Sequence, residues 1–268
     1  MPSYVPKKII WSESKEKRMV FLHLPGSASP WPVEAVSFDL WETLIQLKDG
    51  KESRIRFLAE CLGRAKQPRE LEAFMKAYQA GQSRFHLDWY EKQRYFGAEQ
   101  RVRLMLKELD AHLSEDDIRS CTLHFQRAIL EDPPPPMEGA PELLDWLSSR
   151  VPLVLVSDSG LTPGTVLREI LELHGLLSHF SATVFSDETG FTKPDPRMFQ
   201  EALRRLEVSP SRVIHVGDNP KTDVAGALKA NLGAVWLDGT GQGECEEGRP
   251  LLRVERLPEL LASLSDDV

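Results

Sequence analysis

The sequence has few of the features that mark secreted and membrane-bound proteins. It contains only three cysteines, Cys61, Cys121 and Cys245, whose odd number and wide spacing fit neither a disulfide framework nor a CxxC metal site. We therefore expect free thiols in a reducing compartment. No apolar run approaches the ~20 residues of a membrane-spanning helix, and the N-terminus lacks the apolar core of a signal peptide. These absences predict a cytoplasmic protein that does not enter a membrane.

Acidic residues outnumber basic ones, with 41 Asp and Glu against 33 Lys and Arg. The formal net charge of −8 argues against nucleic acid as a partner, because binding along a phosphate backbone needs clustered Lys and Arg. A small anion in a local pocket remains compatible with that charge, and no pattern points to a protein partner.

The length of 268 residues suits one α/β domain with an insertion, the simpler interpretation, or two modest domains.

Five apolar runs rich in β-branched residues are predicted strands buried on both faces. They begin at Val33, Val151, Ser181, Arg212 and Gly233 and read VEAVSFDL, VPLVLVSD, SATVFSD, RVIHVGD and GAVWLD. Helical patterns with apolar residues three and four apart separate them, and we expect Gly175 and Gly233 to be C-terminal caps of helices. The alternation predicts an α/β fold: a Rossmann-like, doubly wound parallel sheet with helices on both faces.

Two segments in the first half of the chain depart from this alternation. Residues 1–31 form a poorly patterned N-terminal extension, in which the apolar runs at 9–10 and 19–22 either pair as strands or pack on the surface. Residues 48–136 carry helical periodicity and no convincing strand, and we expect them to form a helical cap over the carboxyl edge of the sheet. The expected core consists of the remaining residues, 32–47 and 137–268.

Acidic, hydroxyl and lysine side chains follow the predicted strands, at the edge where parallel sheets bind ligands. Asp39 in FDLWETL can attack a phosphoryl group if a cation offsets the repulsion between two anions. Mg²⁺ suits this role because it takes oxygen ligands, and Asp218 and Asp223 of GDNPKTD supply further carboxylates. Lys193 in FTKPDP and Ser157 in VLVSDSG can bind phosphoryl oxygens. These positions predict a phosphoryl-transfer site.

In this order the motifs resemble those of the haloacid dehalogenase-like hydrolase superfamily, in the branch with a helical cap after the first motif. The similarity runs from about Val33 to Asp238. It implies that Asp39 forms an aspartyl-phosphate and that Ser157 and Lys193 bind the phosphoryl group.

The resemblance also implies a magnesium cofactor. Asp39, Asp218 and Asp223 would hold the ion, together with the backbone carbonyl of the residue at position 41, here Trp41. We further assign to the substrate side of the site three residues of the first motif and one of the second, Leu40, Trp41, Thr43 and Asp158.

Two residues depart from the family pattern. Phosphatase members usually have Asp at the position of Trp41, where it protonates the leaving alkoxide and later activates water, and tryptophan can do neither. Because general acid–base help is worth about 10²–10⁴ in rate, esters with poor leaving groups should turn over slowly. Asp158 stands where relatives usually have Asn. We hypothesise that neighbouring carboxylates raise its pKa, so that it partly replaces the missing acid.

Three functions fit these motifs. The first is a magnesium-dependent phosphohydrolase acting through Asp39 on a small phosphorylated metabolite, with a preference for good leaving groups. The second is a 2-haloacid dehalogenase, because such relatives carry an aromatic residue at the position of Trp41, although they lack the carboxylate pair of Asp218 and Asp223. The third is a binding or regulatory protein that has lost turnover.

The insertion contains a polar-aromatic cluster that could meet the substrate. We interpret it instead as a solvated helix face with a few core contacts. Its members are His86, Asp88, Trp89, Tyr90 and Arg94.

Overall fold

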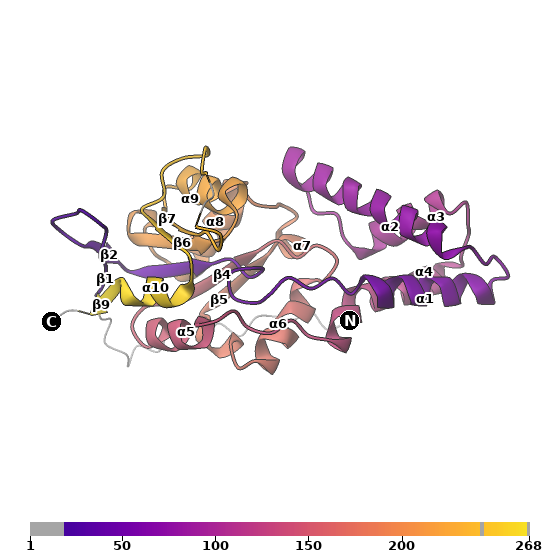
Figure 1. The fold of residues 1–268 in the computed structure, drawn as a ribbon, viewed down its shortest axis with the longest axis horizontal. Helices are drawn as coiled ribbons and strands as arrows, with labels where there is room; N and C mark the ends of the chain where they lie inside the picture. Colours follow the sequence, from indigo (N-terminus) through magenta and orange to yellow (C-terminus); the bar gives the residue numbers. More distant parts are fainter. Residues whose placement is uncertain (1–18, 242–243, 267–268) are drawn as a thin grey trace.

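The computed structural model describes residues 19–241 and 244–266, which form a sheet-centred body with a helical lobe at one end (Figure 1). The predicted run at 9–10 lies outside these residues. The central sheet has six strands in the order β5-β4-β3-β6-β7-β8, and every neighbouring pair is parallel. Its strands are β3 (Ala35–Phe38), β4 (Leu153–Ser157), β5 (Ala182–Phe185), β6 (Val213–Gly217), β7 (Gly233–Leu237) and β8 (Leu252–Val254).

β3 is the strand at which the winding of the sheet reverses. Phe38 lies opposite Leu155 of β4 on one side and Val216 of β6 on the other. In doubly wound sheets, ligands bind beyond the carboxyl ends of the strands at this reversal. The predicted fold class is therefore confirmed, and the first motif stands at its switch point.

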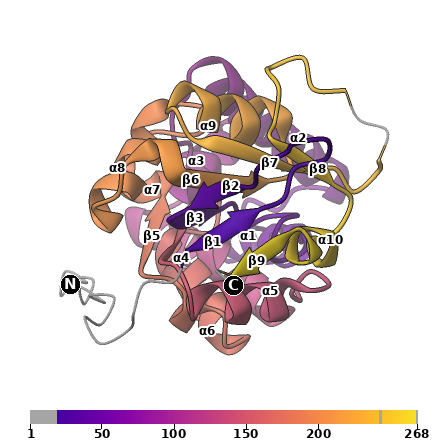
Figure 2. The same ribbon diagram turned by 90° about the vertical axis from the view of Figure 1, so that its left-hand side faces the viewer.

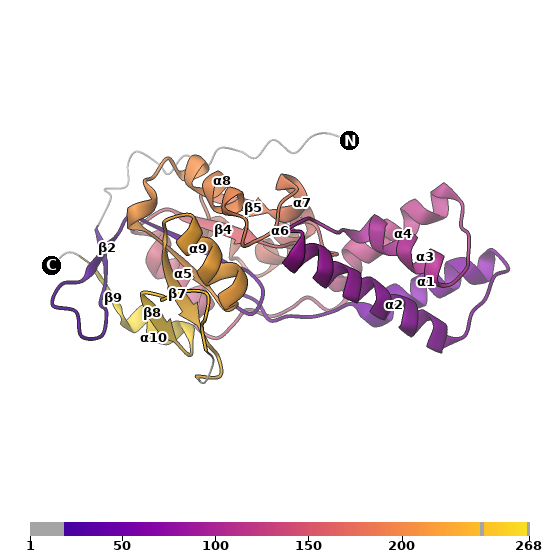
Figure 3. The same cartoon turned by 90° about the horizontal axis from the view of Figure 1, so that it is seen from above.

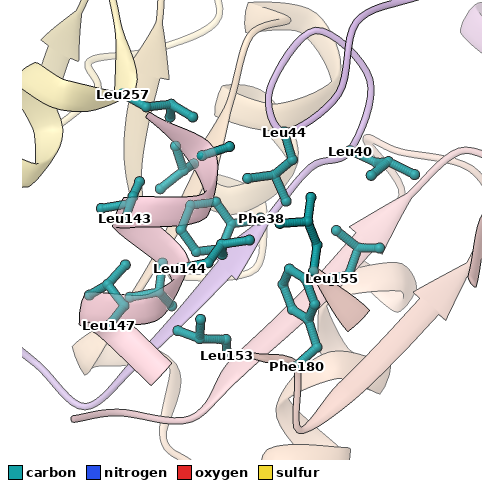
Figure 4. Close-up of a cluster of buried hydrophobic side chains, with 14 of the residues drawn as sticks. Phe38, Leu40, Leu44, Leu143, Leu144, Leu147, Leu153, Leu155, Phe180 and Leu257 are labelled. Atoms are coloured by element: carbon teal, nitrogen blue, oxygen red, sulfur yellow. The ribbon is translucent and has the colours of Figure 1, made fainter. Parts of the chain in front are cut away.

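Helices cover both faces of the sheet (Figure 2). Leu153 and Leu155 of β4 belong to the apolar cluster under α5, α6 and α10, whereas Val154 and Val156 belong to the cluster under α8 and α9. This alternation is the two-residue period of a strand buried on both sides. Figure 4 shows the first cluster, where Phe38 lies among leucines of α5 and β4. The bounds are α5 (Ala140–Ser148), α6 (Gly164–Leu173), α8 (Pro196–Leu206), α9 (Ala225–Lys229) and α10 (Leu257–Ala262).

The helical lobe extends from the carboxyl end of the sheet (Figures 1 and 3). Its helices pack around an apolar cluster of their own, and we call residues 48–136 the cap. Its longer helices are α1 (Lys51–Arg64), α2 (Leu71–His86), α3 (Ala98–Glu108) and α4 (Glu115–Arg127). Short helical turns in the cap and elsewhere are η1 (Leu87–Glu91), η2 (Ala128–Glu131), η3 (Leu177–His179), α7 (Ser186–Thr189), η4 (Pro210–Arg212) and η5 (Pro220–Val224).

The segment before the core forms strands rather than a surface-packed tail. β1 (Val20–Leu22) pairs antiparallel with β2 (Trp31–Val33) and with β9 (Leu264–Asp266). Val20 and Leu22 are fully buried in the cluster under α5 and α10. Residues 20–22 are thus part of the core packing.

One of the two predicted helix caps is wrong. Gly175 follows α6 with a φ of 71°, as the cap role requires. Gly233 instead begins β7, and the left-handed residue after α9 is Asn231, with a φ of 61°. Asparagine tolerates this conformation because its short polar side chain can hydrogen-bond locally.

The cysteines are free, as expected, although two of them are close in space. The Sγ atoms of Cys61 and Cys121 lie 3.4 Å apart in the cap core. Within residues 19–241 and 244–266, no helix has the length and apolarity needed to cross a bilayer.

Candidate active site

Three buried ionisable side chains meet beyond the carboxyl ends of β3 and β6. Lys193 Nζ donates to Asp39 Oδ1 at 2.5 Å and to Asp223 Oδ1 at 2.6 Å. None of the three side chains is more than 7% exposed. Asp39 directly follows β3, and its backbone N–H donates to the carbonyl of Val216 at 2.9 Å. The sheet therefore brings together Asp39 and Lys193, which are 154 positions apart in the sequence.

Asp223 is held in place by its own loop and by β6. A Cβ atom on Gly217 would lie 2.4 Å from the Asp223 carboxyl carbon, so only glycine lets η5 approach the strand this closely. The backbone N–H of Asn219 donates to Asp223 Oδ2 at 3.0 Å, and His215 Nε2 lies 3.3 Å from Asp223 Oδ1. Sequence reasoning missed His215, although it stands in the same HVGD run.

These contacts set the charge of each group. Burial would raise the pKa of Asp223, but Lys193 and His215 outweigh it and lower that pKa to about 2. Burial would likewise lower the pKa of Lys193, but Asp223 and Asp39 raise it, so the lysine stays charged. Burial raises the pKa of Asp39 well above its ordinary value despite the attraction of Lys193. Burial and the charge of Asp223 raise the pKa of Asp218 to about 7.

The carboxylates of Asp39, Asp218 and Asp223 form a cluster that suits a divalent cation. Each offers one oxygen, and these oxygens lie within 4.8 Å of one another. Hard oxygen donors are the ligands that Mg²⁺ takes in proteins. A cation there would also relieve the repulsion that raises the pKa of Asp218 and Asp39. The residues present therefore fit the magnesium ion that the sequence predicts.

The second motif contributes two buried side chains. Ser157 ends β4, is fully buried, and its Oγ has no hydrogen-bond partner among the described residues. Asp158 Oδ1 accepts from the backbone N–H of Lys193 at 3.1 Å, and Oδ2 accepts from Trp89 Nε1 at 2.9 Å. Burial raises the pKa of Asp158 to about 6. Asp158 thus connects the lysine loop to the cap.

A cavity of about 360 Å³ lies between the sheet end and the cap. Trp41 lines it and is partly buried against the core, so the aromatic side chain of the first motif faces the site. Leu40 and Thr43 are fully buried and do not line it, so the structure gives them no side-chain contact there. Thr43 Oγ1 lies 3.5 Å from Asp218 Oδ1 and Leu40 packs in the core. Other lining residues are Asp39, Trp89, Arg101, Asp158, Lys193 and Asp218.

Two members of the aromatic cluster of the cap make contacts with the core, of the kind that the interpretation as a solvated face with a few core contacts includes. Besides the Trp89 contact with Asp158, Tyr90 Oη accepts from Asn219 Nδ2 at 3.1 Å. Both residues lie in η1, a π-helical turn that continues directly from α2. Asp88, by contrast, pairs within the cap with Arg84 and Lys92.

Comparison of the sequence with models of protein families shows to which family the chain belongs. A model of haloacid dehalogenase-like hydrolases matches residues 33–231, which include every motif residue described above. The chain belongs to this family. The resemblance drawn from the motifs is therefore confirmed.

Curated relatives within the family match over part of their length. A phosphoserine phosphatase from Thermus thermophilus is 46% identical over 93 residues, which are 35% of this chain and 37% of the relative. A pyrimidine 5′-nucleotidase from Escherichia coli is 30% identical over 127 residues, 47% of this chain and 55% of that protein. A glyceraldehyde 3-phosphate phosphatase from Methanothermobacter thermautotrophicus is 43% identical over 64 residues, 24% of this chain and 28% of the relative. The chain thus spans between about a quarter and about half of these relatives.

Solved structures share the fold over nearly their whole length. A HAD-hydrolase from Bacillus subtilis bound to magnesium superposes with a TM-score of 0.63 at 20% identity, covering 86% of this chain and 97% of that one. A 2-haloacid dehalogenase from Pseudomonas syringae gives 0.64 at 23% identity, covering 86% and 98%. At these identities the likeness establishes the fold and not the activity.

Proposed function

We propose that this protein is a magnesium-dependent phosphohydrolase that forms an aspartyl-phosphate on Asp39 from a small phosphorylated substrate. The observation that carries the proposal is the buried contact of Lys193 with Asp39 and Asp223, beside a third carboxylate, Asp218. A dehalogenase has no need of this carboxylate cluster, whereas a phosphoryl group needs cations around it. Relatives named as phosphatases support the same reaction class.

The proposed chemistry has two displacements at phosphorus. A carboxylate oxygen of Asp39 bonds to phosphorus while the bond to the leaving oxygen breaks, and that oxygen takes a proton from solvent or from an acid in the site. Water then attacks the same phosphorus, loses a proton and displaces Asp39, which releases inorganic phosphate. Lys193 offsets the negative charge that builds up between Asp39 and the phosphoryl oxygens. A bound Mg²⁺ would add further positive charge and favour the ionised nucleophile.

Trp41 predicts a strong dependence on the leaving group. Its side chain lines the cavity where a general acid would stand, and an indole cannot protonate an alkoxide. We expect kcat/KM to fall steadily as the leaving-group pKa rises through a series of aryl and alkyl phosphates. A rate that does not change across this series would contradict the prediction.

The variant Trp41→Asp makes this prediction sharper. An acid at this position should raise the turnover of alkyl phosphates by up to about 10²–10⁴-fold and flatten the dependence on the leaving group. Trp41→Asn is the matched control, since it opens the same space without an ionisable proton. Equal gains in both variants would attribute the effect to access and not to acid catalysis.

Asp158 is the candidate for a replacement acid. With a pKa of about 6, its protonated fraction grows as the pH falls through 6. The turnover of alkyl phosphates should therefore rise over the same acidic limb of the pH profile. We expect Asp158→Asn to remove this limb and to lower alkyl phosphate turnover about 10-fold or more below pH 6. The measurement is a pH profile of both proteins, and unchanged or faster turnover by the variant would eliminate this role.

Dehalogenation is the second candidate because an aromatic side chain, Trp41, lines the cavity next to the nucleophile. Halide release from a 2-haloacid in the presence of a metal chelator would favour it over the phosphohydrolase. Loss of all activity on removal of the metal, restored by Mg²⁺, would favour the phosphohydrolase.

A further inference from the structure

The cap places a buried arginine in the wall of the cavity. Arg101 comes from α3, is 1% exposed, and is among the largest fully buried side chains of the described chain. Its guanidinium carbon lies 5.4 Å from the ring centre of Tyr78 and 5.9 Å from that of Phe96. Stacking of this kind holds the planar group in one orientation. Arg101 is therefore a fixed part of the cavity wall and not a mobile surface cation.

The neighbouring helix leaves room for this side chain. A Cβ atom on Gly81 of α2 would lie 2.2 Å from Arg101 Cδ and 2.8 Å from its Nε. A larger residue at position 81 would displace the arginine from its place beside α2, which runs along α3 (Figure 3). The two cap helices thus form a slot for one guanidinium.

The charge in this slot has no partner of opposite sign within ion-pair distance among the described residues. Arg101 Nε has no hydrogen-bond acceptor, and Nη1 and Nη2 reach only Gln82 Oε1, at 3.5 and 3.4 Å. A buried cation without a partner is costly to the folded protein, so these donors are expected to serve a ligand. Burial lowers the pKa of Arg101 to about 10, which still leaves it charged at neutral pH.

A second arginine in the same wall provides an internal comparison. Arg54 is also buried, yet its Nη1 pairs with Asp49 Oδ1 at 2.8 Å and its Nε donates to the carbonyl of Phe125 at 2.8 Å. Asp49 thus compensates the charge of Arg54, whereas the charge of Arg101 has no carboxylate within ion-pair distance among the described residues. That charge matches one monoanion, and the planar fork of Arg101 matches the two oxygens of a carboxylate.

We propose that Arg101 binds a carboxylate of the substrate, so that the substrate is a small phosphorylated compound carrying a carboxylate at the end remote from its phosphoryl group. This inference rests on the proposed phosphohydrolase function, because Arg101 and the Asp39–Lys193 site line the same cavity. Arg101 then selects among phosphorylated compounds, while the sheet residues act on the phosphoryl group that these compounds share.

The kinetic test pairs a protein variant with a substrate variant. The substrates are 4-carboxyphenyl phosphate and 4-carbamoylphenyl phosphate, which have similar shapes and differ in the charge at the remote end. We expect Arg101→Met to lower kcat/KM for the carboxylate about 10- to 100-fold and to leave that for the amide nearly unchanged. Arg103→Met is the control, since Arg103 lies on the same helix but is exposed and paired with Glu99 and Glu115. Equal losses on both substrates would overturn the proposal.

A binding test needs no turnover and separates this inference from the proposed function. Calorimetry with 3-phosphonopropionate, its amide and ethane-1,2-bisphosphonate, each with Mg²⁺, measures how the group remote from the phosphonate changes the binding affinity. The proposal expects the carboxylate to bind the wild type most tightly and to lose this advantage in Arg101→Met. Equal binding of carboxylate and amide, or preference for the bisphosphonate, would overturn it. If binding follows the expectation but no phosphate ester is hydrolysed, the carboxylate site stands and the catalytic proposal fails.

Folding of the variant is checked by its thermal unfolding. Methionine fills a similar length of the slot and removes an unpaired buried charge, so Arg101→Met should unfold at the same temperature as the wild type or higher. Arg101→Lys provides the second variant: it keeps the charge but loses the fork, and should retain only part of the discrimination.

Discussion

Asparagine in place of Asp39 should abolish phosphatase turnover, by about 10⁴-fold or more, without unfolding the protein. The amide cannot form the aspartyl-phosphate, although it retains an oxygen in the same place. Lys193 keeps its contact with Asp223 in the variant, so its charge remains paired. The measurement is the release of inorganic phosphate from a panel of phosphate esters with Mg²⁺, before and after the substitution.

Asp116→Asn is the matched control for this experiment. Asp116 lies on the outer surface of the cap, with its side chain 86% exposed, and the same chemical change there should leave turnover intact. Residual activity in Asp39→Asn equal to that of the wild type would mean that Asp39 is not the nucleophile. If neither the wild type nor Asp39→Asn hydrolyses any ester of the panel, the third function is favoured, a binding protein that keeps the fold.

Methionine in place of Lys193 should cause the second large loss, in both stability and turnover. The lysine is the buried partner of two carboxylates, and removing one partner of a buried ion pair costs about 3–5 kcal/mol in the free energy of unfolding. Turnover should fall as well, because removal of one preorganised group that offsets transition-state charge costs about 10²–10³-fold. Urea denaturation in the presence of a chelator measures the stability of the metal-free protein.

The pH dependence of stability should differ between the wild type and Lys193→Met. In the wild type the low pKa of Asp223 contributes stability above the unfolded pKa, and this is lost as the pH falls through about 4 to about 2. Burial raises the pKa values of Asp39, Asp158 and Asp218 in both proteins, so both should lose stability as the pH rises above about 4. Without Lys193, burial also raises the pKa of Asp223, so the variant should lose more stability over this range than the wild type. Mg²⁺ should restore part of it by binding the carboxylates. Lys221→Met is the control, because Lys221 is exposed, and a loss of stability there equal to that at Lys193 would contradict the assignment.

The convergence of Asp39, Lys193, Asp218 and Asp223 could be predicted from the sequence because it depends on topology alone. Each residue lies just after a predicted strand or in the loop that follows one. The carboxyl ends of parallel strands lie at the same edge of the sheet. The roles assigned to these residues remain proposals. The burial of Ser157 behind the cavity wall could not be predicted, because it depends on how far β4 extends.

The cap could be predicted as a helical insertion but not as a contributor of particular side chains. Trp89 reaches Asp158 only because α2 passes into the π-helical turn η1, which shifts the helical period by a residue. Arg101 looks like an ordinary surface cation in QRVRLMLKEL, and its burial depends on Gly81 of another helix. Contacts between helices depend on the directions of individual side chains. These directions produce no periodic pattern in a single sequence.

The small sheet of β1, β2 and β9 determines how the first and last strands of the described chain can open. Terminal segments usually fray one at a time, because each is held by its own few contacts. Here the first and last strands of the described chain, Val20–Leu22 and Leu264–Asp266, are paired with each other. Release of either strand therefore removes a neighbour from the other, and release of β9 also separates Asp266 from Arg150. Both ends of the described chain should open together, as one cooperative unit in hydrogen exchange.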